Sequence, residues 1–331
     1  MKAIVQEKAG GKLSVQEIPI PEPGPGEVLV KMKYAPINPS DLSQLEGTYA
    51  SRPDYPFVPG IEGCGQVVKS GRGFIPRIRK GRRVACTTSA NRGGTWAEYM
   101  VTSALKTIPL DNKISDEKGA MLLVNPLTAL AFVEIAKRGK HKVILNNAAA
   151  SSLGLMLNYM CSKNNISLIN IVTKDTQENY LKKHGAKNIL NSSSENYENE
   201  LADTVRKLNC HLFFDAVGGD QAEILIRLSP PGSTLVSYAK LSEQNIEIDT
   251  RLILQHNKKI QGFFLGKYTS DNSVIQNLSS VNKVKKMLAG DMEINISARY
   301  PFNSASKAVD YYRNNMSAGK VLFFSEESKE V

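Results

Sequence analysis

The feature that most constrains the fold is a regular alternation of strand-like and helix-like segments over residues 141–266. Six short apolar runs read as strands: HKVILNN, ISLINIV, KNIL, HLFFDAV, STLVSYA and KKIQGFFLG. Between them lie segments with helical periodicity, such as SLGLMLNYMCSKNN, ENELADTVRKLN and DQAEILIRLS. Strands that alternate with helices form a parallel sheet covered on both faces. Six of them predict an α/β, doubly wound dinucleotide-binding domain.

The first strand of this series leads into NNAAASSLGLML, residues 146–157. A phosphate-binding turn usually carries three glycines, and only Gly154 remains here. Small residues at 148–152 still allow a pyrophosphate to approach, and Ser151 and Ser152 suit a helix start. The alternative is a strand-to-helix turn without a ligand. The surrounding alternation favours nucleotide binding.

The end of the second strand bears on the choice of cofactor. The acid that binds the ribose 2′-hydroxyl of NAD is expected about 20 residues after the turn. Thr173 and Lys174 occupy that place, and Asp175 follows. The missing acid and the neighbouring lysine favour NADP(H). A register shift of two residues would instead let Asp175 serve as the acid for NAD.

The first third of the chain has a different pattern, with short alternating segments broken by Gly and Pro. KAIVQE, LSVQEI, EVLVKMKYAPIN, GCGQVVKSG, GRRVACTTS and WAEYMVTS read as strands of an antiparallel, barrel-like region of about 110 residues. After residue 274 the chain has a helix and then returns to short strands. It ends with a helical segment, ASKAVDYYRNN, and a final strand, KVLFFS.

Composition limits the protein class. The chain has 331 residues, 41% of them hydrophobic and 22% charged, which is typical of a folded, soluble protein. Its four cysteines are far apart and predict reduced thiols rather than a disulfide framework. The N-terminus resembles no signal or transit peptide, and the most apolar segment, 120–133, falls short of a membrane span. We therefore expect a cytoplasmic protein without a membrane partner.

The formal charge of +10 attracts phosphate-bearing or acidic partners without choosing among them. Six basic residues lie in GRGFIPRIRKGRR, residues 71–83. A solvated loop is the favoured interpretation of this segment. A dock for the phosphates of coenzyme A or for an acidic carrier protein is the alternative. Phe74 and Ile75 give a weak nucleic-acid signal, but no RNA-binding signature accompanies them.

A series of motifs spans about 300 residues in a fixed order. It contains NPSDLSQLEGTY (38–49), GIEGCGQVV (60–68), GGTWAEY (93–99), VNPLTAL (124–130), the turn with Ala148, Ser151 and Gly154, DAVGGD (215–220), GSTLVSYAK (232–240) and GFFLGKY (262–268). In this order they resemble the medium-chain dehydrogenase/reductase superfamily. The most similar branch is the zinc-independent one, which holds the quinone oxidoreductases and the 2-enoyl thioester reductases.

The resemblance implies a GroES-like β-barrel catalytic domain from residues 1–119 and 268–331, with a Rossmann NADP-binding domain at 120–267. It places the catalytic tyrosine at Tyr49. Its NADP(H) positions fall on Asn125, Thr128, Ala150, Ser151, Ser152, Leu153, Thr173, Lys174, Tyr238, Ala239, Lys240, Leu241, Phe263, Phe264, Leu265 and Lys320. Asn38 is a further candidate, although turn chemistry before Pro39 would also explain it. The chain departs from the family pattern at Ser152, Thr173 and Phe264.

The activity that follows is hydride transfer from NADPH to an activated C=C, most plausibly in a 2-enoyl thioester. Tyr49 would donate a proton or stabilise the enolate, since a phenol with a pKa near 10 is protonated at neutral pH. An NADPH:quinone oxidoreductase is the first alternative. The second is a non-catalytic nucleotide-binding protein with nucleic-acid affinity. Relatives imply a homodimer formed through KKIQGFFLG.

Zinc can be judged by counting ligands. A catalytic zinc needs three protein ligands from Cys, His or carboxylate groups. The four histidines, His141, His184, His211 and His256, lack metal-type spacing, and the chain has no CxxC. We therefore expect no metal.

Overall fold

The computed structural model describes residues 1–49, 53–89 and 92–325. The chain divides into two units, residues 1–124 with 284–331 and residues 125–283. Both boundaries lie further along the chain than residues 119 and 267, where the sequence placed them. Residues 268–283 belong to the second unit because Glu134 binds both ends of the segment. Its carboxylate accepts a hydrogen bond from Tyr268 Oη and pairs with Lys283 Nζ, each at 3.0 Å.

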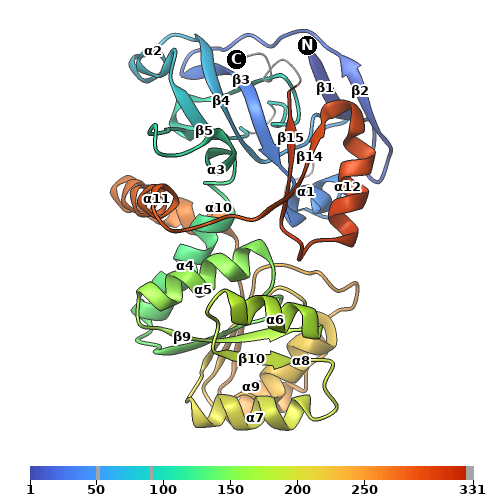
Figure 1. Ribbon diagram of the computed structural model, residues 1–331, viewed down its shortest axis with the longest axis vertical. Coiled ribbons are helices and arrows are strands. Elements are labelled where there is room, and N and C mark those ends of the chain that lie inside the picture. Colours follow the sequence, from blue (N-terminus) through green and yellow to red (C-terminus); the bar gives the residue numbers. More distant parts are fainter. Residues whose placement is uncertain (50–52, 90–91, 326–331) are drawn as a thin grey trace. The chain divides into compact units, whose positions relative to one another are not determined.

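The second unit is built on a six-stranded parallel sheet (Figure 1). Its strand order is β10-β9-β8-β11-β12-β13. The strands are β8 (Val143–Asn146), β9 (Ser167–Val172), β10 (Asn188–Asn191), β11 (Leu212–Asp215), β12 (Thr234–Ser237) and β13 (Lys259–Gly262). This order is that of a doubly wound dinucleotide fold and confirms the predicted α/β domain. All six predicted strands are present.

Helices precede, connect and follow these strands. They are α4 (Asn125–Arg138), α5 (Ser152–Lys163), α6 (Asp175–Lys183), α7 (Tyr197–Lys207), α8 (Gly219–Leu228), α9 (Thr250–His256), α10 (Leu265–Asp271) and α11 (Val274–Ala289), the last of which crosses the unit boundary. Leu145, Ile169, Phe213 and Leu235 form the centre of the core and are fully buried. Strands covered on both faces explain the near-continuous apolar runs of the sequence.

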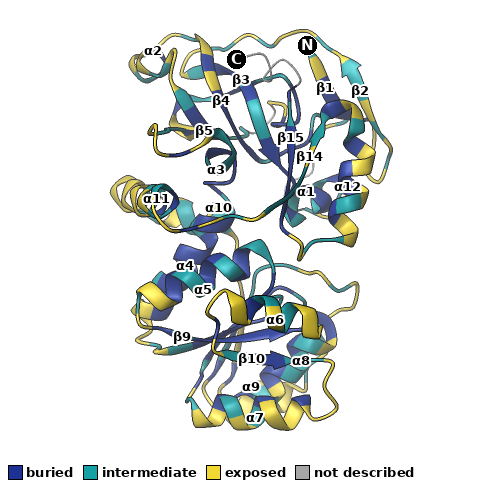
Figure 2. Cartoon of the chain, in the orientation of Figure 1, coloured by how far each residue is buried: buried dark blue, intermediate teal, exposed yellow. Residues whose placement is uncertain are grey.

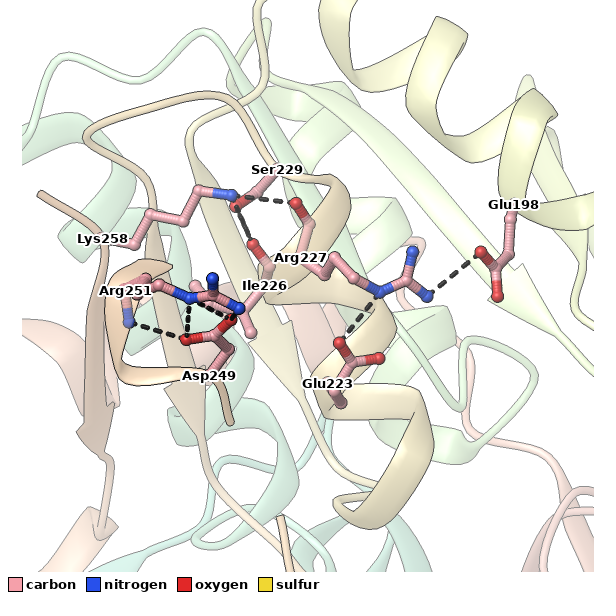
Figure 3. Close-up of polar contacts among 8 residues, drawn as sticks. All are labelled: Glu198, Glu223, Ile226, Arg227, Ser229, Asp249, Arg251 and Lys258. Atoms are coloured by element: carbon pink, nitrogen blue, oxygen red, sulfur yellow. Dashed lines mark hydrogen bonds and ion pairs between the residues drawn. The ribbon is translucent and has the colours of Figure 1, made fainter. Parts of the chain in front are cut away.

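A buried lysine fixes the C-terminal end of α8. Figure 3 shows Lys258 Nζ donating to the carbonyl oxygens of Ile226 and Arg227, at 2.7 and 3.0 Å. Lys258 is buried, and a cation at a helix C-terminus is favourable because the last carbonyls have no helical partner. On the same turn, Arg227 binds Glu223 and Glu198, which ties α8 to α7. The lysine thus satisfies backbone groups without a carboxylate partner in the described structure.

The first unit contains two sheets. β1 (Lys2–Gln6) and β2 (Leu13–Glu17) pair antiparallel. The larger sheet has the order β14-β15-β3-β4-β5-β7, and β6 also pairs with β3. Its strands are β3 (Glu27–Pro36), β4 (Glu62–Ser70), β5 (Arg83–Thr87), β6 (Tyr99–Ser103), β7 (Thr107–Pro109), β14 (Ile296–Pro301) and β15 (Lys320–Phe324). β15 pairs antiparallel with β3, so segments from both ends of the chain build this unit.

Short helices complete the first unit: α1 (Pro39–Leu45), α2 (Phe74–Arg79), α3 (Asp116–Ala120), α12 (Ala305–Asn314) and the 3₁₀ turns η1 (Ala104–Lys106) and η2 (Phe302–Ser304). α2 lies in the segment that the sequence interpreted as a loop. Figure 2 shows it mostly exposed. The core between the sheet and α12 includes Trp96 against Phe323, whose ring centroids lie 4.8 Å apart. Within the described residues, no helix is both long and apolar enough to cross a bilayer.

Candidate active site

The turn between β8 and α5 keeps the backbone of a glycine-rich turn with almost no glycine. Ala148 has a φ of +49°, a left-handed conformation that glycine usually provides. Ser151 caps α5, since its Oγ accepts a hydrogen bond from the Gly154 amide at 3.2 Å. At Gly154 a Cβ would lie only 2.1 Å from the carbonyl oxygen of Ala149. Position 154 therefore has no room for a side chain, because the backbone before the helix passes directly against it.

This turn suits a pyrophosphate. The amides of Ser152 and Leu153 begin α5, and no described residue accepts a hydrogen bond from them. Free amides and the positive end of the helix dipole favour an anion at this position. Asn146 is fully buried at the end of β8, and its Nδ2 has no partner in the described structure. These hydrogen-bond donors lie at the carboxyl end of a parallel strand, where dinucleotides bind in this fold, and the oxygens of a dinucleotide could accept from them.

A cavity of about 590 Å³ opens at the ends of β9 and β10. Its lining includes the predicted residues Thr173 and Lys174, together with Asp175, Glu178, Ile189, Asn191, Ser193, Ser194 and Glu200. Asp175 accepts a hydrogen bond from Asn191 Nδ2 at 2.7 Å, and Glu178 pairs with Lys182 at 2.6 Å. Two of the three acids therefore have partners of their own, and Lys174 is the cation of the lining.

The other predicted positions of the second unit lie near the ends of the remaining strands. Asn125 and Thr128 are buried in the first turn of α4. Tyr238 follows β12 and donates from its hydroxyl to Asn146 Oδ1 at 3.0 Å, and residues 239–241 continue the same loop. Phe263 packs edge-on against Phe132, whereas Phe264 is 47% exposed. Leu265 begins α10.

The first unit contains a buried polar cluster of Asn38, Asp41, Glu62 and Lys320, each at most 1% exposed. Lys320 Nζ donates to Asn38 Oδ1, and Asn38 Nδ2 donates to Glu62 Oε1 at 3.1 Å. The cluster joins α1, the start of β4 and the start of β15. Sequence analysis named Asn38 and Lys320 separately and missed the two acids. Both acids lie within the motifs at 38–49 and 60–68, and this position could have identified them as candidates.

Both carboxylates of the cluster also hold backbone. Glu62 Oε2 accepts hydrogen bonds from the amides of Leu123 and Val124, each at 3.0 Å. Asp41 accepts from the amides of Asn38 and Ile61, at 2.7 and 2.9 Å. The cluster therefore fixes the backbone at the starts of α1 and β4. It also fixes residues 123 and 124, where the chain leaves the first unit.

Burial shifts the acid–base chemistry of these groups. It raises the pKa of Asp41 to about 7, with the nearby charge of Glu62 adding to the effect. Burial also raises the pKa of Glu62 and lowers that of Lys320, while the attraction between the two opposes both shifts. One ammonium thus compensates two carboxylates in a water-poor site.

Tyr49 follows α1, where its amide donates to the carbonyl oxygen of Ser43 at 3.1 Å. Burial raises its pKa to about 12, and the charge of Asp41 contributes. The phenol is therefore fully protonated at neutral pH and can act as a hydrogen-bond or proton donor. Tyr49 borders residues 50–52, which lie outside the described structure.

Comparison with known proteins agrees with both units. Residues 24–112 match the family model of the alcohol dehydrogenase GroES-like domain, and residues 152–280 match that of the zinc-binding dehydrogenases. A mitochondrial enoyl-[acyl-carrier-protein] reductase of Arabidopsis thaliana is 32% identical over 284 residues, which cover 82% of this chain and 74% of the relative. The chain belongs to the medium-chain dehydrogenase/reductase superfamily. It is an oxidoreductase of this superfamily.

Further relatives support the same placement. The corresponding mitochondrial reductase of Caenorhabditis elegans is 29% identical and aligns with 86% of this chain and 84% of its own. The solved structure of a Mesorhizobium loti protein, provisionally named an NADPH:quinone reductase, superposes with a TM-score of 0.91. It is 28% identical and covers 98% of both chains.

The family model that matches the second unit is named for zinc binding. It is therefore relevant whether the side chains of this chain could coordinate a metal ion. Within residues 1–49, 53–89 and 92–325, no three His, Cys, Asp or Glu side chains are grouped to hold a metal ion. All four cysteines are buried, and burial raises the pKa of each thiol. The absence of a metal remains a prediction from ligand counting.

Proposed function

We propose that this oxidoreductase transfers hydride from NADPH to the β-carbon of an activated alkene, with a 2-enoyl thioester as substrate. The observation that carries the proposal is the pair of free amides, Ser152 and Leu153, at the start of α5. They follow a turn of small residues in a chain whose relatives are named enoyl-[acyl-carrier-protein] reductases. Both the turn and these relatives therefore support a nucleotide-dependent reductase.

The predicted cofactor positions divide by the part of NADP(H) that each would hold. Ala150, Ser151, Ser152 and Leu153 would hold the pyrophosphate, because their backbone borders the free amides. Thr173, Lys174 and the loop Tyr238, Ala239, Lys240 and Leu241 would hold the phosphorylated ribose. Asn125, Thr128, Phe263, Phe264 and Leu265 would hold the nicotinamide, which supplies the hydride. Asn38 and Lys320 remain proposed contacts, and they bond to each other within the cluster.

Tyr49 is the proposed proton donor or oxyanion stabiliser. Replacing it with Phe removes the hydroxyl while keeping the ring, so we expect kcat with crotonyl-coenzyme A to fall by about 100-fold. The NADPH dissociation constant should stay unchanged. Steady-state kinetics and calorimetry measure the two quantities. Full crotonyl thioester reduction by the variant would remove Tyr49 from this role.

A quinone reductase is the second candidate, and the 28% identical quinone-reductase-like structure favours it. NADPH oxidation measured with crotonyl-coenzyme A and with a quinone in parallel separates the two. If neither acceptor is reduced and the protein binds RNA in a salt-sensitive way, both reductase proposals fail, and a non-catalytic nucleotide-binding protein takes their place.

Cofactor preference should depend on Lys174. The Lys174→Ala variant removes the cation of the cavity at the ends of β9 and β10. We expect the KM for NADPH to rise by about tenfold, because one charge-assisted hydrogen bond to a phosphate is lost, while the KM for NADH changes little. Lys187→Ala, an exposed change in the same unit, is the control. Equal effects on both cofactors would contradict the assignment.

We also propose a homodimer that forms through β13. This strand is the edge of the six-stranded sheet, and its four residues are all exposed. An exposed edge strand offers unpaired backbone groups to a second copy. The cytoplasmic location remains a prediction from the sequence.

A further inference from the structure

One surface of the first unit combines exposed apolar and basic side chains. Phe74 and Ile78 on α2 are 77% and 46% exposed, and Leu105 on η1 is 73% exposed. The two elements meet at Gly26. The Gly26 amide donates to the carbonyl oxygen of Arg72 at 2.8 Å, and the Ala104 amide donates to that of Gly26 at 2.9 Å. These hydrogen bonds bring the three apolar side chains to one edge of the unit.

The same edge carries a strong positive charge. From residue 63 to residue 97 the sequence has eight lysines and arginines and no acid. Arg72, Arg77, Lys80 and Arg82 are exposed, and none has an acidic partner among the described residues. Glu22 and Glu27 are paired with Lys69 and Arg92. We call these four cations, together with Phe74, Ile78 and Leu105, the α2 patch.

Like charges are crowded at the patch. The Arg79 guanidinium is partly buried beneath it, and its Nε has no hydrogen-bond partner in the described structure. Burial and the charge of Arg82 lower the pKa of Arg79. An external anion would relieve this repulsion, because no carboxylate of the described residues pairs with the four cations.

The patch lies apart from the buried cluster of Asn38, Asp41, Glu62 and Lys320 in the first unit. β4 begins at Glu62, in the buried cluster, and ends at Ser70, just before the patch. Nine residues of strand separate the two ends by roughly 26 Å, at about 3.3 Å per residue. The patch is therefore a separate feature of the first unit and not an extension of the buried cluster.

We propose that the α2 patch docks the protein on the surface of an anionic lipid bilayer. Phe74, Ile78 and Leu105 enter the boundary between head groups and acyl chains, and the four cations bind lipid phosphates and carboxylates. Peripheral binding of this kind requires no spanning segment. The proposal departs from the expectation of no membrane partner, which rested on the lack of a spanning segment and of a targeting peptide in the sequence.

The apolar side chains favour lipid over nucleic acid. A polynucleotide gains from cations and from aromatic rings that stack on bases, and Phe74 is the patch's single aromatic residue. Exposed Ile78 and Leu105 contribute little to such a contact, whereas a bilayer buries all three apolar side chains. A test of whether binding depends on these apolar side chains therefore distinguishes a lipid bilayer from a polynucleotide.

The test is sedimentation of the full-length protein with vesicles of phosphatidylcholine alone or with 30% phosphatidylserine added. We expect binding only to the anionic vesicles. The triple variant Phe74→Ser, Ile78→Ser, Leu105→Ser should lower the partition coefficient by about tenfold. The double variant Arg77→Glu, Lys80→Glu should lower it by at least about 25-fold, at roughly fivefold per lost cation.

Matched controls lie in the second unit. Val274→Ser with Ile275→Ser removes two exposed apolar side chains, and Lys187→Glu with Lys207→Glu reverses two exposed cations. Neither control should change vesicle binding. Wild-type protein that fails to bind anionic vesicles overturns the proposal. So does a triple variant that binds vesicles like the wild type, or a wild type that binds a 30-nucleotide RNA and no vesicles.

Discussion

The Lys320→Met variant should lose about 3–5 kcal/mol of stability, and its unfolding temperature should fall by roughly 10 °C. The substitution keeps the length and apolar stem of the side chain and removes the one ammonium of the cluster. Asp41 and Glu62 are then buried without a compensating cation. Scanning calorimetry of both proteins measures the difference.

The loss should depend on pH. Without the ammonium, the pKa of the buried Glu62 carboxyl rises further above its unfolded value, since attraction to Lys320 now lowers it. A raised folded-state pKa gives stability that is present at low pH and lost as pH rises. The deficit of Lys320→Met relative to wild type should therefore be larger at pH 8 than at pH 5.5. A deficit that does not change with pH would contradict this account of the cluster.

Two further variants isolate the charge effect. Lys258→Met removes the other buried lysine described above, which binds only carbonyl oxygens, so we expect a smaller loss of about 1–2 kcal/mol in stability.

The double variant Glu62→Gln, Lys320→Met should recover part of the stability that Lys320→Met loses. In it Asn38 can turn its amide so that Oδ1 accepts from the new glutamine amide, and no buried charge remains at that pair. Additive losses would mean that Glu62 and Lys320 are not coupled.

The Gly154→Ala variant should lose dinucleotide binding. Its new methyl group would lie 2.1 Å from the carbonyl oxygen of Ala149 and 2.6 Å from the carbonyl carbon. Backbone cannot rotate away as a side chain can, so the turn must open and the start of α5 must shift. We expect the NADPH dissociation constant to rise by at least tenfold, as measured by calorimetry, with about 1–3 kcal/mol lost in stability.

Gly93→Ala is the matched control, because the nearest atom to the position that its Cβ would take is Val58 Cβ at 3.4 Å, an ordinary van der Waals contact. Its stability should stay within about 0.5 kcal/mol of wild type. If Gly154→Ala bound NADPH like the wild type, the turn would not hold the pyrophosphate. The nucleotide proposal would then lose its main support.

The strands of the second unit and their parallel arrangement could be predicted because apolar period and turn residues are local properties. All six strands of the second unit were anticipated, and their alternation with helices implied the parallel order. Helix α6 and the short helices α1, α2, α9 and α10 were not. The four short helices have seven residues or fewer each, and the contacts of the folded chain decide whether such short segments become helical.

Sequence and tertiary structure contributed different parts of the candidate site. The residues at 148–154 could be recognised as a degenerate turn because strand, small residues and helix start are adjacent in the chain. The left-handed φ of Ala148 could not be read from the sequence, since alanine rarely adopts it and only the packed surroundings enforce it. Tyr49 was found only through the resemblance of its motif.

The sequence by itself determined the α/β class and the superfamily, because these depend on periodicity and on motifs of adjacent residues. Only the tertiary structure decided that Asn38, Asp41, Glu62 and Lys320 form one buried cluster. Lys320 lies 282 residues from Asn38, and the antiparallel pairing of β15 with β3 brings the two together. A charge can be buried only where opposite charges and hydrogen bonds surround it, and that environment exists only once the chain has folded.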